Sequence, residues 1–459
     1  MNDLSALLAQ LRLALGDQAV LTGDAISPRH HSDWSGHAAT CPAALLLPNS
    51  TEQVASALRL CHAAGRSVVP QGGMTGLAGA AVPRPEDIAL SLQRLQGVEE
   101  VDLAGATITV RAGTTLETLQ QAASDVGLLL PLDLGARGSC QIGGNIATNA
   151  GGNSVIRYGM ARDLVLGLEV VLADGRVLDL MNKMIKNNCG YDLKQCFIGS
   201  EGTLGVITRA VLKMVPRPAA PLTLLCALPD YPSAVKLLRR LQAAVGMPQA
   251  FELMWQDFFS LGVSWLEQPR SPLSLEHPLY VLVDVAASRE AVEHCLETAL
   301  HDGEVLDAII ANSYAQTREL WKIREATAEF PTRLRPLNFD VSLPIGEIGD
   351  FAERCQQRLD EHWPGNRSVY FGHIGDGNLH LTVDLDSLPD SLPLFEVEKV
   401  VYSTVGEWGG SVSAEHGIGL LKREFLHYSV SPEALLMMKQ LKGCFDPRGI
   451  LNPGKIFES

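Results

Sequence analysis

The chain has 459 residues, about three times the common domain size, and its 46% hydrophobic and 19% charged residues are typical of a globular protein, so we expect at least two domains. Lys and Arg number 37 against 52 Asp and Glu, and the resulting net charge of −15 argues against nucleic acid and anionic membrane surfaces as partners. The apolar stretches end before the ~18 residues that a membrane span needs, so the chain is not expected to span a membrane.

The first 23 residues favour an amphipathic helix over a signal peptide. Leucines recur at helical spacing, and Asp3 stands where a signal peptide has basic residues. The nine cysteines include no C-x-x-C pair, which excludes a zinc ribbon and a disulfide framework. We therefore expect reduced thiols in a cytoplasmic protein.

The first half of the chain alternates strands with helices. The predicted β-α-β unit consists of a strand at 43–47, a helix that opens at Ser50-Thr51-Glu52, and a strand at 67–70. Further along the chain we expect a strand at 108–110, a helix at 115–127 and strands at 165–172 and 206–215. Pro216-Arg217-Pro218 indicates a domain boundary.

The second half reads as a separate α+β domain of strands and long amphipathic helices. The expected strands are 222–228, 279–285, 341–343, 368–372 and 379–383, and the expected helices are 231–244, 288–300, 316–329, 345–363, 392–407 and 432–444.

Three tracts of small residues lie in the first half, at 70–79, 135–152 and 199–207. Glycines allow backbone N–H groups to turn inward around phosphate oxygens, so the first tract could bind a phosphate. It is not a Walker A loop, and Pro83 and Pro85 exclude a dinucleotide-binding helix. A tight surface loop is the alternative for one tract alone, but three tracts together favour one large flat ligand.

These tracts, together with Lys186–Lys194 and Asn452-Pro453-Gly454-Lys455, resemble flavin dehydrogenases of the vanillyl-alcohol-oxidase family, in the branch of D-2-hydroxyglutarate, D-lactate and glycolate dehydrogenases. The resemblance implies an α+β fold with a two-subdomain FAD-binding domain at 1–218. It also implies an α+β, ferredoxin-like substrate and metal cap at 219–424. A C-terminal segment at 425–459 would return to the flavin.

The resemblance also implies FAD contacts, with the first tract at the pyrophosphate and the others beside the flavin and adenosine. No histidine stands beside Met74 for a covalent link, so we expect non-covalent FAD. The implied cofactor residues are Pro70, Gln71, Gly72, Gly73, Met74, Thr75, Gly76, Leu77, Pro131, Ser139, Gly143, Gly144, Thr148, Asn149, Ala150, Gly151, Gly152, Glu201, Gly205, Ile207 and Asn452.

Two histidines flank an Asp-Gly pair in the segment Phe371–His380. Asp-Gly between strand-like runs predicts a two-residue hairpin turn with positive φ at both turn residues. That turn would place His373 directly opposite His380, close enough for both imidazoles to bind one ion.

Glu415 and His416, in a loop with Gly417 and Gly419, offer a carboxylate and a third imidazole. Two histidines and one glutamate leave an open coordination position, as in catalytic metal sites. Buried histidines satisfied by the backbone are the alternative. The resemblance implies His373, His380 and Glu415 as ligands of a divalent metal, zinc, and His416 as the base. Glu415 and His416 can both reach one site only if the backbone bends at Gly417.

A hydroxy-acid substrate needs a cation for its carboxylate, and Arg324 matches the family's carboxylate-binding arginine. A solvated helix face is the alternative for Arg324. The 2-hydroxyglutarate enzymes have a lysine where this chain has Asn338, so the second carboxylate needs another partner, for which Arg333 and Arg335 are candidates.

The leading functional hypothesis is a metal-assisted FAD dehydrogenase that oxidises D-2-hydroxyglutarate, with hydride passing from C2 to the flavin. A D-lactate or glycolate dehydrogenase is the first alternative. A flavin-bearing electron-transfer subunit with a structural metal site is the second. The expected partners are an electron acceptor, such as an electron-transfer flavoprotein or a quinone, and a second copy in a homodimer.

Overall fold

The computed structural model describes residues 4–267, 270–389 and 391–458. They form two compact units, of which the first comprises residues 4–152, 158–217 and 415–458 and the second residues 153–157, 218–267, 270–389 and 391–414. The chain enters the second unit briefly at 153–157, and its next change of unit falls between 217 and 218, within Pro216–Pro218, the segment expected to be a boundary. The last falls between 414 and 415 instead of after 424, because the loop after Ala414 is hydrogen-bonded to the first unit: Leu420 N–H donates to Ala78 O.

A four-stranded sheet with the order β1-β2-β4-β3 begins the first unit. Its strands β2 and β3 both pair with β4 in parallel, and helix α2 connects them, which confirms the β-α-β prediction. The Ser50 side chain accepts the backbone N–H of Gln53 and so caps α2. The elements are α1 (Leu4–Leu15), β1 (Val20–Leu21), β2 (Ala44–Leu46), α2 (Thr51–Ala64), β3 (Val68–Gln71) and β4 (Ile88–Ser91).

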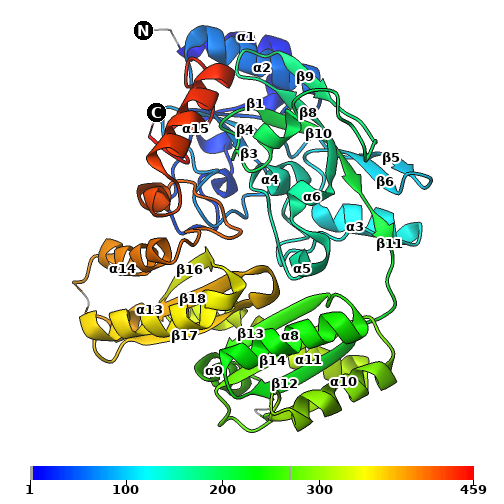
Figure 1. Ribbon diagram of the computed structural model, residues 1–459. Helices are drawn as coiled ribbons and strands as arrows, with labels where there is room; N and C mark the ends of the chain where they lie inside the picture. The colour runs from blue at the N-terminus through cyan, green and yellow to red at the C-terminus, as the bar shows by residue number, and fades with distance from the viewer. Residues whose placement is uncertain (1–3, 268–269, 390, 459) are drawn as a thin grey trace. The chain divides into compact units, whose positions relative to one another are not determined.

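A five-stranded antiparallel sheet with the order β5-β6-β10-β8-β9 follows. Helices α3 and α4 and the two-stranded pair of β7 with β11 accompany it, and the C-terminal helix α15 closes the chain (Figure 1). The elements are β5 (Val98–Asp102), β6 (Thr107–Arg111), α3 (Leu116–Asp125), β7 (Leu128–Leu129), α4 (Ile142–Ala147), α5 (Val155–Tyr158), α6 (Ala161–Leu164), β8 (Val165–Val171), β9 (Val177–Leu180), α7 (Lys194–Phe197), β10 (Val206–Lys213), β11 (Val215–Pro216) and α15 (Pro432–Phe445).

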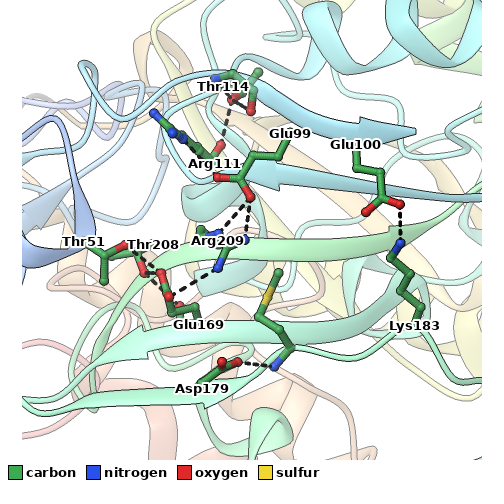
Figure 2. Close-up of polar contacts among 12 residues, drawn as sticks. Thr51, Glu99, Glu100, Arg111, Thr114, Glu169, Asp179, Lys183, Thr208 and Arg209 are labelled. Atoms are coloured by element: carbon green, nitrogen blue, oxygen red, sulfur yellow. Dashed lines mark hydrogen bonds and ion pairs between the residues drawn. The ribbon is translucent and has the colours of Figure 1, made fainter. Parts of the chain in front are cut away.

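A polar network ties α2 to this second sheet (Figure 2). Buried Glu169 on β8 accepts hydrogen bonds from Thr51 Oγ1 at 2.6 Å and from Thr208 Oγ1 at 2.8 Å. Arg209 bridges Glu169 to Glu99, which also pairs with Arg111. These bonds give the buried carboxylate of Glu169 its partners and fix the first turn of α2 against the sheet.

The second unit is built on a seven-stranded sheet with the order β15-β12-β14-β13-β17-β18-β16. Every pairing in it is antiparallel, which agrees with the expected α+β cap. The strands are β12 (Leu222–Leu228), β13 (Ala250–Trp255), β14 (Leu279–Val285), β15 (Asp307–Ile310), β16 (Pro336–Ser342), β17 (Arg367–His373) and β18 (Asn378–Asp384).

Helices pack against this sheet, and α8 lies along β12 and β14 (Figure 1). The alternate side chains of these strands, including Leu225 and Leu282, form a hydrophobic cluster with Phe258 on α9 and Leu320 on α11. The helices are α8 (Tyr231–Val245), α9 (Gln256–Ser264), α10 (Arg289–His301), α11 (Tyr314–Arg324), α12 (Phe330–Arg333), α13 (Ile348–His362) and α14 (Leu394–Glu407). Within the described residues, every helix is too short or too polar to cross a bilayer.

The predicted register of the histidine hairpin is wrong. Residues Ile374–Asp376 form a 3-10 turn, and the strands pair His380 with Phe371 instead of His373. Gly377 has a φ of +90°, whereas Asp376 is not among the described residues with positive φ, so the two-residue turn does not form. The shift is two residues, which keeps both histidines on the same face of the sheet.

Two other elements differ from their predictions. The helix expected at 316–329 ends at Arg324 and continues as a 3-10 turn over Glu325–Glu329. The strand expected at 341–343 begins at Pro336, because its backbone pairs with β18 along seven residue pairs from Pro336 to Ser342. Asn338 is therefore a strand residue.

Candidate active site

The first unit contains a cavity of about 420 Å³, within the usual size range of cofactor and small-molecule sites. All three small-residue tracts line it, although they are far apart in the sequence. The residues that were expected to bind FAD and that line the cavity are Pro70, Gln71, Gly72, Gly73, Met74, Thr75, Gly76, Leu77, Gly143, Gly144, Thr148, Ala150, Gly151, Glu201, Gly205 and Ile207.

Glycines allow the backbones of these tracts to approach closely. A Cβ atom on Gly73 would lie 2.1 Å from the carbonyl oxygen of Ser139, and one on Gly143 would lie 2.7 Å from the Cβ of Ala112. Any larger residue at these positions would push the first and second tracts out of place. The small residues are therefore required by the construction of the cavity.

Strained backbone gathers around the same cavity. Met74, Glu201 and Asn452 have φ values of +60°, +51° and +45°, which non-glycine residues rarely adopt. The Asn452 side chain links the third tract to the residue that follows the first, because its Nδ2 donates to Ala80 O at 2.9 Å and to Glu201 O at 2.6 Å. Such conformations persist where surrounding contacts impose them, often at ligand sites.

The lining suits a ligand with polar edges and buried phosphate charge. Gln141 Oε1 and Asn145 Oδ1 are buried acceptors for which the described residues provide no hydrogen-bond partner. The described lining contains no lysine or arginine, so backbone N–H groups must face the phosphates. These features fit FAD, whose flavin carries hydrogen-bonding groups and whose pyrophosphate is anionic.

Five of the expected cofactor residues lie outside the lining described above. Ser139 lines an adjoining cavity of about 860 Å³ with Arg29 and Arg94. Asn149 Oδ1 accepts the Arg162 backbone N–H, which directs it toward α6. Pro131, Gly152 and Asn452 also do not line the cavity of about 420 Å³.

Other lining residues were not predicted from the sequence. Asp33 and Trp34 come from the segment between β1 and β2, and Gln141 and Asn145 flank the predicted Gly143 and Gly144 of the second tract. The polar residues interspersed with glycines in 135–152 were the available signal for Gln141 and Asn145, whereas no motif points to Asp33 or Trp34.

Glu415 and His416 line the cavity as well, in the loop that starts the last segment of the first unit. The buried carboxylate of Glu201 holds this loop: it accepts the Ile418 N–H at 2.7 Å and the Gly419 N–H at 2.8 Å. Gly417 has a φ of +80°, which provides the expected bend. Burial raises the pKa of Glu201, and these two hydrogen bonds oppose the increase.

Two other residues close to His416 in the sequence, Lys422 and His427, could also accept a proton, but they are placed differently. Lys422 is buried in the same segment, and its backbone N–H donates to Ile418 O. His427 is exposed, and its Nδ1 lies 2.8 Å from Glu424 O. Neither residue lines the cavity of about 420 Å³, so His416 has the favoured position.

In the second unit the sheet brings His373 and His380 together. Their ring centroids lie 5.2 Å apart at an interplanar angle of 83°. His380 Nδ1 lies 3.8 Å from an Asp340 carboxylate oxygen, and Asp340 is opposite His380 in the β16–β18 pairing. The same Asp340 oxygen accepts the Asn378 amide at 2.8 Å, which fixes its orientation. This face of the sheet combines nitrogen and oxygen donors suited to a divalent metal.

A buried glutamate that was not predicted joins the metal and substrate candidates. Glu252 Oε1 lies 2.6 Å from His373 Nδ1, and its Oε2 accepts the Arg324 Nε–H at 2.8 Å. Arg324 is buried and its guanidinium lies 4.8 Å from the Phe371 ring centroid, which excludes the solvated-face alternative. Burial would raise the pKa of Glu252, but the His373 and Arg324 charges prevail and lower it to about 2.

The remaining substrate candidates lie at the surface of the second unit. Asn338 Oδ1 accepts the Thr382 hydroxyl at 2.7 Å, and the Asn338 residue is exposed. Arg333 is exposed and lies 3.9 Å from Glu329. Arg335 is also exposed, and its backbone N–H donates to Asp384.

Comparisons with known families agree with this architecture. Residues 42–181 match the family described as "FAD binding domain", and residues 217–456 match "FAD linked oxidases, C-terminal domain". The first match covers most of the cavity-lining tracts, and the second covers both histidines of the sheet.

Relatives of known name align along almost the whole chain. The D-2-hydroxyglutarate dehydrogenase of Stutzerimonas stutzeri is 38% identical over 98% of this chain and 99% of its own length. The mitochondrial D-2-hydroxyglutarate dehydrogenase of Bos taurus is 39% identical over 98% of this chain and 83% of its own length.

Solved structures share the fold at lower identity. p-Cresol methylhydroxylase with substrate bound has a TM-score of 0.77 and 16% identity, and the similarity covers 99% of this chain and 97% of that one. Alkyldihydroxyacetonephosphate synthase has a TM-score of 0.75 and 17% identity over 98% of this chain and 85% of that one. Together with the cavity and its three tracts, these matches show that the chain belongs to the FAD-linked oxidases, in the branch that contains the D-2-hydroxyglutarate dehydrogenases, and is an FAD-dependent oxidoreductase.

Proposed function

We propose that this chain is an FAD-dependent, metal-assisted dehydrogenase that oxidises D-2-hydroxyglutarate to 2-oxoglutarate. One observation carries the proposal: His416, a group that can accept a proton near neutral pH, lines the same cavity as the three FAD-binding tracts. The names of the full-length relatives support the choice of substrate.

The proposed chemistry divides between a cofactor and fixed side chains. FAD, when bound, supplies the two-electron oxidant. Arg324 binds the substrate carboxylate through its Nη groups, because its Nε already donates to Glu252. His416 removes the proton of the 2-hydroxyl group, and a divalent metal, zinc, would lower the pKa of that hydroxyl when bound.

His373, His380 and Glu415 are the proposed metal ligands. Support for Glu415 comes from chain connectivity, because Ala414, the residue before it, donates its backbone N–H to Asp340 O at 3.3 Å. Asp340 pairs with His380 across β16 and β18. Two imidazoles and one carboxylate leave a coordination position for substrate.

The proposed function is tested by anaerobic addition of D- and L-hydroxy acids while the flavin absorbance is recorded. Bleaching by D-2-hydroxyglutarate, with no bleaching by the L-isomer, is the expected result. If no hydroxy acid bleaches the flavin of the metal-loaded protein, the dehydrogenase proposal is wrong and an electron-transfer role is favoured.

One observation favours a second candidate, a dehydrogenase of D-lactate or glycolate. Asn338 offers a neutral amide, with its oxygen already bonded to Thr382, at the position where the resemblance to the 2-hydroxyglutarate enzymes implies a lysine. A carboxylate at the far end of a five-carbon acid then needs another cation. A shorter acid would need none.

Replacing Arg333 or Arg335 by alanine separates these candidates. We expect D-2-hydroxyglutarate to be used better than D-lactate, and at least one variant to raise the KM for D-2-hydroxyglutarate about tenfold or more, because a hydrogen bond to a charged group is lost. The KM for D-lactate should change much less. Steady-state kinetics with both acids measures this, and equal effects, or a parent enzyme that prefers D-lactate, would favour the shorter acid.

Non-covalent FAD gives another prediction. The purified protein should be yellow and should release free FAD when precipitated with acid, because the only histidine in the described cavity lining is His416, outside the first tract. Absorbance spectra of the supernatant and pellet measure the release. Colour that stays with the pellet would contradict the non-covalent attachment.

We further propose an electron-transfer flavoprotein or a quinone as electron acceptor, and a homodimer as the assembly. We also propose the cytoplasm as the location. All nine cysteines lie within the described residues and are free thiols, which is typical of a reducing compartment.

A further inference from the structure

Glu252 occupies a central position in the second unit. It lies on β13, between β14 and β17, and is 1% exposed. The strand register places it directly opposite His373, and Arg324 reaches it from the end of α11. The two oxygens of one carboxylate thus contact a proposed metal ligand and the proposed substrate-binding arginine.

Position 252 requires a carboxylate, because both oxygens of its side chain must accept a hydrogen bond. The Arg324 Nε–H can only donate, so Glu252 Oε2 must accept. The other oxygen of the same carboxylate, Oε1, lies 2.6 Å from His373 Nδ1, so Nδ1 is the ring nitrogen that donates. The tautomer with its proton on Nδ1 has its lone pair on Nε2, the atom that a metal needs.

A second carboxylate on the same sheet shows the contrast. Asp284 on β14 accepts the Thr223 hydroxyl at 2.6 Å, and burial raises its pKa to about 6. Its hydrogen-bond partners are neutral, the Thr223 hydroxyl and Trp321, where Glu252 has His373 and Arg324, and the Glu252 charge adds to the increase in its pKa. The comparison separates a carboxylate that supports packing from one that contacts two functional side chains.

We propose that Glu252 is a positioning residue that orients His373 for the metal and Arg324 for the substrate carboxylate, and so couples the two binding events. The inference rests on the proposed function and adds a residue to it. One carboxylate fixes the tautomer of the histidine and, through the Nε–H bond, the orientation of the guanidinium. Loss of the carboxylate should therefore weaken both metal and acid binding.

The test compares Glu252→Gln with Asp284→Asn as a matched control, both as full-length proteins with FAD. A glutamine has one acceptor and one donor, so it cannot accept from both Arg324 and His373. We expect the zinc dissociation constant of Glu252→Gln, measured by chelator competition, to rise about tenfold to a hundredfold. The dissociation constant for 2-oxoglutarate, measured by perturbation of the oxidised flavin spectrum, should rise at least tenfold.

The control should keep both constants within threefold of the parent. Glu252→Asp retains the charge, so it should fold even if Glu252→Gln does not. Its side chain is one methylene shorter, so it should show intermediate losses of affinity for zinc and for the acid. Unchanged affinity for zinc and for the acid in Glu252→Gln would overturn the inference. If Glu252→Gln does not fold, the same result in Glu252→Asp would overturn it. Equal losses of affinity in Asp284→Asn would also overturn it. Loss of one affinity alone would overturn the coupling.

Zinc binding and flavin reduction by the unsubstituted parent protein show whether a negative result contradicts this inference alone or the proposed function as well. A parent that binds zinc and reduces its flavin with a hydroxy acid, together with an unaffected Glu252→Gln variant, contradicts only the role of Glu252. A parent that binds no zinc contradicts the proposed metal site and overturns the inference with it.

Discussion

Removal of the metal by a chelator, or replacement of His380 by alanine, should slow reduction of FAD by substrate more than a hundredfold and leave FAD bound. Stabilisation by a metal acting as a Lewis acid is worth several kcal/mol, and about 1.4 kcal/mol corresponds to a factor of ten in rate. FAD should stay bound because His380 belongs to the second unit, whereas the residues that line the cofactor cavity belong to the first.

Stopped-flow absorbance of the flavin measures the rate, and elemental analysis measures the metal. His301→Ala is a matched control, because this histidine lies in the same unit with an 88% exposed side chain beside Asp302. The control should keep its metal and its rate. Normal turnover by chelated protein that is verified to be free of metal would show that the site is structural or absent.

The sequence predicted most of the elements because their signals are local. Strands 222–228 and 279–285 agree with β12 and β14, and the N-cap at Ser50 sets the start of α2. The predicted turn at Asp376-Gly377 was wrong because the pairing of β17 with β18 selects a longer turn. The side-chain period of two explains why the two histidines still share a face.

The sequence predicted those residues of the candidate site that lie in a recognisable motif. The three small-residue tracts and the 413–419 loop have recognisable compositions, and they line one cavity. Glu252 has no such signal, since it contacts His373, which is 121 positions away, and only the strand pairing brings them together. Glu201 was expected as a cofactor residue of the third tract, but its bond to Ile418, 217 positions away, has no signal in the sequence.

Replacement of His416 by alanine should lower the rate of flavin reduction by about 10²–10⁴-fold, the usual contribution of a positioned general base, with little change in bound FAD or metal. His416 lines the cavity proposed for FAD, and Glu201 fixes its loop through the Ile418 and Gly419 N–H groups, so the position of His416 in the lining is fixed. The loss should appear in the rate of reduction at saturating substrate, because the base acts on the reacting proton.

Single-turnover reduction by D-2-hydroxyglutarate, followed at the flavin absorbance maximum, measures this effect. His427→Ala provides the comparison, because His427 is an exposed imidazole in the same unit whose Nδ1 donates to the Glu424 carbonyl oxygen, and it does not line the cavity. If His416→Ala stays within threefold of the parent and His427→Ala or Lys422→Met takes the loss, the base lies at that other residue. If His416→Ala also loses its metal, its role is in the metal site and not in proton removal.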